Sequence, residues 1–221
     1  MSAVVRNSRI EDFGQLFDLQ RRVYPTLAPW SMEQFRRHLA VFPEGQFCAW
    51  QDGRLVGAAS SLIVPWNDYG LAHNWPEVTG SGWFDTHNPL GRTLYGAEVF
   101  VDPAIRRTGI GRSLYAARRR LCRTLNLKRI IAAGRFPGYH HHAHQMSANT
   151  YAMKVIWGDF DDSVLRFQLR EGFQFCGVIE GYLPDDVESC NYAALIVWLN
   201  PDYRAPVPHS PTRPQAMVVS P

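Results

Sequence analysis

The sequence has few cysteines, and they are scattered. Cys48, Cys122, Cys176 and Cys190 are widely spaced, and no two of them form a Cys-x-x-Cys pair. Disulfide-stapled secreted domains and structural zinc sites both depend on closely patterned cysteines. The spacing therefore argues against either class. It predicts reduced thiols, mostly buried, in a cytoplasmic protein.

Long apolar runs are also lacking. No stretch reaches the roughly 18 consecutive apolar residues that suggest a membrane-spanning helix. The first residues, Met1 to Phe13, contain no apolar core of a signal peptide. We therefore expect no membrane association and a cytoplasmic location.

Neither sign of charge dominates, because 23 lysines and arginines face 20 aspartates and glutamates, for a net charge of +3. Arginines gather around one glycine loop and the segment after it, 106–123, without any nucleic-acid-binding module beside them. We expect a small polyanionic ligand there and no nucleic acid. The length suits one domain, 1–200, followed by a proline-rich tail, 201–221, that is expected to be disordered.

The stretch from Leu94 to Leu125 predicts a strand, a glycine loop and a helix. Pro103 ends the strand, and the loop contains Gly109 and Gly111. Apolar residues then recur at spacings of three and four, which predicts an amphipathic helix with its arginines largely on the other faces: Leu114, Ala117, Leu121 and Leu125, against Arg118, Arg119, Arg120 and Arg123. The first turn of such a helix has unpaired N–H groups, and glycine lets an anion come close to them. The stretch therefore predicts a phosphate site.

Two nucleotide motifs can be excluded at this loop. A dinucleotide fingerprint needs a third glycine where Leu114 stands, and a P-loop needs a glycine in place of Arg106. What remains is Arg-x-x-Gly-x-Gly after a strand that ends in Val-Asp-Pro, and this resembles the GCN5-related N-acetyltransferase (GNAT) superfamily. The resemblance implies that the loop binds the pyrophosphate of acetyl-CoA, the cosubstrate.

The remaining periodicity supplies the other elements. Ser8 and Glu11 have the spacing of a capping box before a first helix, and Ser31 is expected to cap a second one. Asp52-Gly53 is a hairpin turn between two strands. The expected strands are 3–6, 46–51, 54–64, 94–101, 129–133, 174–183 and 191–198, and the later helices are 147–157 and 162–171. With the resemblance, this predicts an α/β (α+β) protein of the GNAT acyl-CoA N-acyltransferase fold, with a mixed central sheet of about seven strands flanked by helices.

Two segments have an open interpretation. Residues 65–92 are too long for an ordinary connection and rich in aromatic residues, so they form either a lid or wall of an acceptor site or a surface Ω-loop. His140, His141, His142 and His144 lie within five residues, but no carboxylate or cysteine pattern completes a metal site. We expect a polar loop and no metal.

The second half resembles one branch of the family. Three stretches carry this likeness: AGRFPGY, DDSVLRFQLREGF and EGYLPDDVESCNYAALIVWLNP. They are similar to the GNAT domain that is fused ahead of a carbon-nitrogen hydrolase (nitrilase-type amidase) domain. The likeness leaves open a separate amidase-type partner, and a homodimer is open as well.

The resemblance also implies roles for residues of the central stretch. A backbone N–H where the fourth strand leaves the fifth would polarise the thioester carbonyl, and by position it belongs to Val99, Phe100 or Val101. The pyrophosphate would lie on the N–H groups of the loop and first turn, with three arginines adding charge: Arg106, Arg107, Thr108, Gly109, Ile110, Gly111, Arg112 and Ser113.

Glu98 is the candidate general base, acting directly or through water. It lies within an apolar strand, with Gly96 and Phe100 expected on its own face, so burial should raise the pKa of its carboxyl. The alternative is a structural carboxylate paired with an arginine.

The general acid departs from the family pattern. Many GNAT proteins have a tyrosine where this chain has Gln168, at the end of an Asn-x-x-Ala-x-x-Phe-Tyr motif. Tyr139 or Tyr151 is the candidate replacement, water is another, and binding of acyl-CoA without fast turnover is a third. The sequence therefore predicts an N-acetyltransferase that acts on a small-molecule or peptide amine, or a non-catalytic acyl-CoA-binding or regulatory module. A nucleic-acid binder would rest on the arginine-rich helix alone.

Overall fold

The computed structural model describes residues 3–105 and 108–205. Within them, seven strands form one sheet in the order β1-β2-β3-β4-β5-β7-β6. The strands are β1 (Val4–Asn7), β2 (Gln46–Gln51), β3 (Arg54–Val64), β4 (Thr93–Val101), β5 (Arg129–Arg135), β6 (Gln174–Ile179) and β7 (Ala193–Leu199). β4 and β5 run parallel, whereas the other neighbours are antiparallel. The predicted mixed sheet is confirmed.

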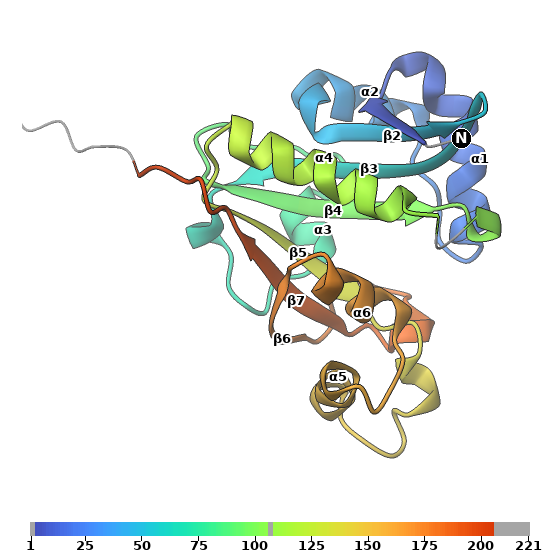
Figure 1. The fold of residues 1–221 in the computed structure, drawn as a ribbon, viewed down its shortest axis with the longest axis vertical. Helices are drawn as coiled ribbons and strands as arrows, with labels where there is room; N and C mark the ends of the chain where they lie inside the picture. Colours follow the sequence, from blue (N-terminus) through green and yellow to red (C-terminus); the bar gives the residue numbers. More distant parts are fainter. Residues whose placement is uncertain (1–2, 106–107, 206–221) are drawn as a thin grey trace, which may run out of the picture.

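Helices cover both faces of the sheet (Figure 1). On one face Leu16 of the first helix and Phe35 of the second pack against Phe100, and on the other Leu114 packs against Ala59. The first face has α1 (Phe13–Val23), α2 (Met32–Val41) and α3 (Trp75–Thr79), and the second has α4 (Ile110–Thr124), α5 (Ala148–Trp157) and α6 (Ser163–Arg170). The central strands β3 and β4 thus bury side chains on both sides.

Local signals account for most element boundaries. Ser31 caps α2 as predicted, with its hydroxyl accepting from the Gln34 N–H at 3.2 Å. Asp52 and Gly53 have φ of 49° and 75°, the positive values that a tight hairpin turn requires. β2 and β3 have the predicted bounds, whereas β5 runs two residues further than predicted and β6 stops at Ile179.

The predicted capping box at Ser8 is wrong. The Ser8 hydroxyl lies 3.1 Å from the Cys48 sulfur, and the Asp12 carboxylate accepts from the Arg9 N–H at 2.8 Å instead. Arg6 of β1 donates to the same carboxylate at 2.7 Å. This ion pair holds Asp12 over the first turn, so Asp12, rather than Ser8, provides the capping side chain there.

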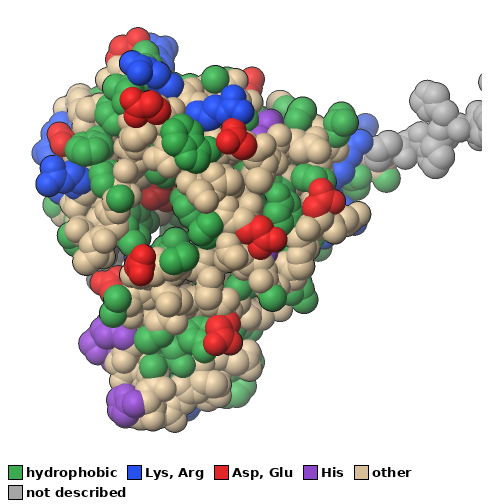
Figure 2. Space-filling model, turned by 180° about the vertical axis from the view of Figure 1, so that it is seen from behind, with side chains coloured by type: hydrophobic (Ala, Val, Ile, Leu, Met, Phe, Trp, Pro, Cys, Tyr) green, Lys and Arg blue, Asp and Glu red, His purple; other side chains and the backbone are tan. Residues whose placement is uncertain are grey.

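The strands β4 and β5 part in the middle of the sheet. They pair only from Thr93 to Gly96, after which β5 continues beside β7 and β4 beside β3 (Figure 1). A bulge lies at the same place, because Ser60 is opposite Glu98 and Ser61 is opposite Gly96, which leaves Ala97 without a partner on β3. Seen from behind, the surface is hollowed between the two halves of the molecule, with acidic side chains beside the hollow (Figure 2).

The 65–92 segment packs on the sheet. Within it Val78 and Phe84 are fully buried, and the Trp75 indole N–H donates to the Ala97 carbonyl at 3.0 Å. The Trp75 backbone N–H donates to the carbonyl of Tyr182, in the connection between β6 and β7, at 2.8 Å. The segment therefore forms a wall that joins the bulge of β4 to the β6–β7 connection, rather than a loop packed on itself.

The remaining expectations concern the cysteines, the membrane and the tail. All four cysteines are free, and Cys48 and Cys122 are buried, whereas Cys176 is exposed. No helix within residues 3–105 and 108–205 is long and apolar enough to cross a membrane. Residues 201–205 still touch the domain, because Asn126 exchanges hydrogen bonds of 2.9 Å with the backbone of Arg204. The rest of the predicted tail lies outside the described residues.

Candidate functional site

The backbone of β4 presents alternate residues to the gap between β4 and β5. The Asp102 N–H donates to Val56 of β3 at 2.9 Å, and the Val99 carbonyl accepts from the Tyr24 hydroxyl at 3.4 Å. Along a strand, the N–H and C=O of one residue point to the same side and successive residues alternate. Val99 and Val101 therefore direct their N–H groups into the gap, whereas the backbone of Phe100 faces β3.

Glu98 lies on the α1 face of β4. Its Oε2 accepts from the Gln20 side-chain amide at 3.1 Å, and Phe100 packs against α1 on the same face, as expected. The expectation that Gly96 shares this face is wrong. A Cβ on Gly96 would point to α4, 3.1 Å from Nη1 of Arg118. The bulge at Ala97 adds a residue and so reverses the alternation.

The environment of Glu98 raises the pKa of its carboxyl to about 8. Burial is the main cause, and it outweighs the hydrogen bond from Gln20 and the charge of Arg118, which both lower the pKa. The ion pairs formed by the described residues do not include Glu98. The carboxyl thus changes protonation in the range that suits a general base.

The glycine loop leads into the N-terminus of α4. Gly109 is the N-cap with φ of 87°, a conformation that favours glycine, and a Cβ there would meet nothing within 4 Å. The first backbone bond of the helix runs from the Ser113 N–H to the Gly109 carbonyl at 3.0 Å. The N–H groups of Ile110, Gly111 and Arg112 precede it, so they have no intrahelical acceptor.

Other side chains of this region are engaged within the protein. Thr108 donates to the Ile105 carbonyl at 2.7 Å, and the Ser113 hydroxyl to that of Gly109 at 3.2 Å. A Cβ on Gly111 would lie 3.0 Å from the Phe167 ring, so this glycine allows α6 to approach α4. Arg106 and Arg107 lie outside the described residues.

Arg112 is shared between the loop and α6. It lies 3.3 Å from the Glu171 carboxylate, which Arg119 also contacts at 3.0 Å. The Arg112 side chain is nevertheless 77% exposed. It can therefore reach an anion at the helix start, although Glu171 competes for its charge.

Gln168 is the residue at which the resemblance implied a tyrosine. It is 4% exposed, and its Nε2 donates to the Tyr115 hydroxyl at 3.3 Å. Its Oε1 is a buried acceptor without a partner in the described part of the chain, and it fills the space that a Cβ on Gly134 would need. The Tyr115 hydroxyl was not predicted as part of the site. Tyr115 follows Leu114 in the helix, where a tyrosine is expected to be a packing residue.

The two tyrosines proposed as general acid lie together near α5. Tyr139 donates to the Met146 carbonyl at 3.0 Å and Tyr151 to the Asp162 carboxylate at 3.0 Å. Burial raises the pKa of both hydroxyls. Their rings are 5.4 Å apart, and neither hydrogen bond joins them to Glu98 or Val99.

Further residues around the gap were not singled out from the sequence. The Arg135 guanidinium at the end of β5 lies 5.7 Å from the centre of the Tyr24 ring and pairs with Asp186 and Glu188 of the β6–β7 connection. Tyr24 connects this cluster to β4, because its hydroxyl donates to the Val99 carbonyl, and Gln20 of α1 donates to Glu98. Only their tertiary positions reveal them, since the sequence around Arg135, Asp186 and Glu188 contains no motif that would bring them together.

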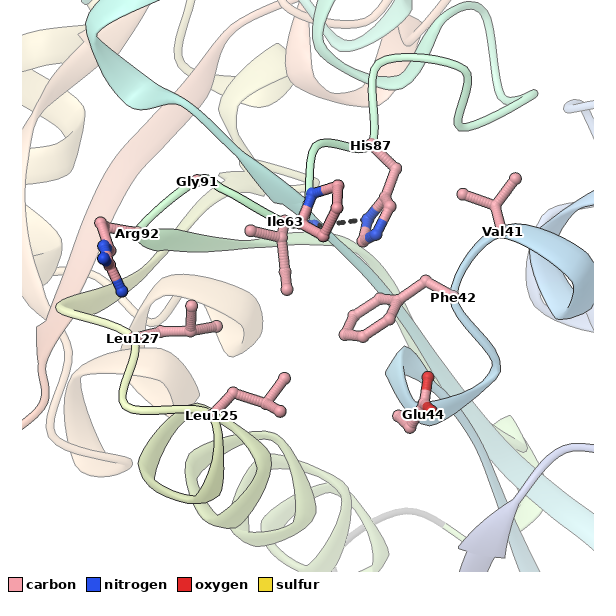
Figure 3. Close-up of a pocket in the computed structure, with 10 residues that line it drawn as sticks. Val41, Phe42, Glu44, Ile63, His87, Gly91, Arg92, Leu125 and Leu127 are labelled. Carbon is pink, nitrogen blue, oxygen red and sulfur yellow. Dashed lines mark hydrogen bonds between the residues drawn. The ribbon is translucent and has the colours of Figure 1, made fainter.

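Two other features do not include the candidate site residues. In the histidine run, His140 contacts the Glu188 carbonyl at 2.9 Å and His142 stacks on Phe160, and no group of three potential metal ligands exists among the described residues. The pocket in Figure 3 lies at the opposite end of β4, where the His87 ring accepts from the Ile63 N–H at 3.1 Å. None of the candidate site residues that the structure describes lines this pocket.

Comparisons with known proteins agree with this geometry. Residues 13–149 match the model of the acetyltransferase (GNAT) family. The chain is 36% identical to the uncharacterized N-acetyltransferase YkwB of Bacillus subtilis (strain 168) over 204 residues, 90% of each protein. It is 44% identical over 200 residues to the probable hydrolase YhcX of the same organism. This match covers 90% of this chain but only 39% of YhcX.

Solved structures show the same fold. The GNAT-like decarboxylase GphF, in complex with isobutyryl-CoA, superposes with a TM-score of 0.74 at 23% identity, covering 89% of this chain and 99% of that one. The ribosomal-protein-S18-alanine N-acetyltransferase of Escherichia coli gives 0.54 at 16% identity, covering 92% and 96%. With the matched family model and the relative YkwB, these findings place the chain: it belongs to the acetyltransferase (GNAT) family.

Proposed function

We propose that the protein transfers an acetyl group from acetyl-CoA to an amine of a small molecule or peptide. One observation carries the proposal: Glu98, whose carboxyl has a pKa near 8, stands next to the Val99 N–H at the gap between β4 and β5. A base and an N–H donor that adjoin in one strand can act on the two partners of an acyl transfer.

Each part of the site would have one task. The N–H groups after Gly109 bind the pyrophosphate, and the Val99 N–H polarises the thioester carbonyl. Glu98, directly or through water, takes a proton from the ammonium form of the acceptor, whose pKa is about 10 when free. The neutral amine then attacks the carbonyl carbon and the carbon–sulfur bond breaks. The nitrogen gives up its second proton as the amide forms, and the leaving thiolate takes up one proton, so this proton passes between them through water or a nearby hydroxyl.

Thermal unfolding with acetyl-CoA, isobutyryl-CoA, CoA and ATP tests the cofactor site. A ligand at a hundred times its dissociation constant adds about 2.7 kcal/mol to the folded state. We expect the CoA compounds, but not ATP, to raise the melting temperature of the wild type and not of Gly109→Glu. Gly109→Gln is the matched control, because it has the same backbone strain without the charge. No shift with any CoA compound would refute the site.

Release of CoA thiol over a panel of small and peptide amines tests the reaction. We expect at least one amine to support turnover in the wild type, and Glu98→Gln to lower the rate by about 100- to 10,000-fold, the usual contribution of a general base. Unchanged turnover in Glu98→Gln would remove this residue from the mechanism.

A second candidate function is a non-catalytic acyl-CoA-binding or regulatory module. Gln168 favours it, because an amide cannot protonate the departing thiolate as a tyrosine can. Binding of acetyl-CoA without turnover of any amine in the panel would be its signature. A related proposal is that the module works beside an amidase-type partner, since the probable hydrolase YhcX extends well beyond the region it shares with this chain. Co-elution of the two in size-exclusion chromatography is the test.

A further inference from the structure

Arg118 places a guanidinium inside the sheet at the bulge of β4. The residue is 1% exposed. Its Nε donates to the Ser61 hydroxyl at 3.0 Å, and Nη2 donates to the carbonyls of Ser60, at 2.7 Å, and of Glu98. It takes part in none of the ion pairs formed by the described residues. A buried charge without a carboxylate partner is costly, so stability alone does not explain it.

The surroundings of Arg118 are shaped to admit it. Gly96 has no side chain where a Cβ would lie 3.1 Å from Nη1 and 3.3 Å from the Ala132 methyl group. Ser60 and Ser61 provide the acceptors on β3, at the step where the register shifts. Gly96 therefore provides the space for the Arg118 guanidinium, and Ser60 and Ser61 provide two of its hydrogen-bond acceptors.

The acceptor on β4 is the informative one. The Glu98 carbonyl belongs to the same peptide unit as the Val99 N–H, and the described residues contain no cis peptide bonds. In a planar trans peptide, C=O and N–H point in opposite directions. A guanidinium that holds this carbonyl on the β3 side therefore turns the Val99 N–H into the gap. A cation donating to a carbonyl also polarises the amide, which makes its N–H a stronger donor.

We propose that Arg118 is a positioning residue: through the Glu98 carbonyl it orients and polarises the Val99 N–H that receives the thioester oxygen. Only the last part, the contact with a thioester, rests on the proposed function. The orientation and polarisation of the amide are properties of the free protein, so the two can be tested separately.

The first test uses the free protein. The variants are Arg118→Met, which keeps the length but not the charge, Arg118→Lys, and Arg120→Met as a control on the exposed side of the same helix. In 1H–15N spectra, we expect the Val99 amide proton to move upfield in Arg118→Met, less in Arg118→Lys, and not in Arg120→Met. An unchanged Val99 resonance in a folded Arg118→Met protein would overturn the proposal.

The second test adds acetyl-CoA labelled with 13C at the carbonyl and needs no acceptor. We expect the infrared carbonyl band to shift down on binding to the wild type and to return toward the free position in Arg118→Met, with the dissociation constant within about two-fold. Once an acceptor is known, kcat should fall by about ten- to hundred-fold with little change in KM, less than the loss of a whole oxyanion donor. An equal band shift in wild type and variant would refute the role.

If the wild type shows no band shift while the Val99 resonance responds to Arg118→Met, the proposed function fails and the positioning role stands. If Arg118→Met does not fold, Ser61→Ala removes only the Nε acceptor. This variant should move the Val99 resonance in the same direction by a smaller amount, and an unmoved resonance would overturn the proposal.

Discussion

Replacing Glu98 by glutamine should stabilise the protein at alkaline pH. In the folded chain the pKa of Glu98 is about 8, against an ordinary value of 4.5. Between these values the folded state holds a proton that the unfolded state has released, so the free energy of unfolding falls as pH rises through this window. Below this pH window Glu98 is protonated in both the folded and the unfolded state. Above it, the folded state bears the full cost of burying the charged carboxylate.

The magnitude follows from the shift. Each pKa unit corresponds to about 1.36 kcal/mol, so the charged carboxylate costs at most roughly 5 kcal/mol above pH 8. Glutamine is neutral at every pH and keeps an oxygen that can accept from Gln20. We expect Glu98→Gln to match the wild type near pH 4 and to exceed it by a few kcal/mol near pH 9.

Urea unfolding at pH 4, 6, 7.5 and 9 measures this difference. Glu11→Gln, which removes an exposed carboxylate, controls for the change in net charge. Parallel pH profiles of wild type and Glu98→Gln would show that the carboxyl is not destabilised by burial. The general-base assignment would then lose its electrostatic support.

Two further predictions concern the α6 side of the site. Gly134→Ala places a methyl group about where Gln168 Oε1 lies, and overpacking of this kind should cost about 1–3 kcal/mol in chemical denaturation. Glu171→Gln releases Arg112 and Arg119 from their shared carboxylate, so CoA should bind several-fold more tightly at low ionic strength, with the gain lost in high salt in a titration.

The sequence predicted those parts of the fold that rest on local patterns. These patterns span only a few residues each: the Asp52-Gly53 turn, the Ser31 cap and the alternation within strands. Local residue types and periodicity were therefore sufficient to predict these elements. The bulge at Ala97 could not be predicted in this way, because it depends on how β3 and β4 are aligned by residues far apart in the chain. That single inserted residue is why Gly96 was assigned to the wrong face.

The burial of Arg118 is a second feature that could not be predicted from the sequence. The expectation that it lies away from the apolar face of α4 is wrong, since the residue is buried. Its position, four residues after Leu114 and three before Leu121, is on the apolar stripe by helical geometry. Its charge led to the opposite interpretation, because nothing local indicates that Gly96 and two serines of another strand provide room and acceptors for a guanidinium.

The Glu98 carboxyl and the Arg118 guanidinium are both positioned by the bulge of β4. Glu98 directs its carboxyl to the α1 face, where burial raises the pKa, while its carbonyl is held by Arg118 from the α4 side. The inserted residue at Ala97 makes this division possible, because it turns Glu98 toward α1 and leaves Gly96 open to the arginine. In a regular strand, Gly96 and Glu98 would share one face. On the α4 face the carboxylate would lie on the same side as the guanidinium, and an ion pair between them would lower its pKa. The bulge keeps the base and the cation on opposite sides of the same peptide.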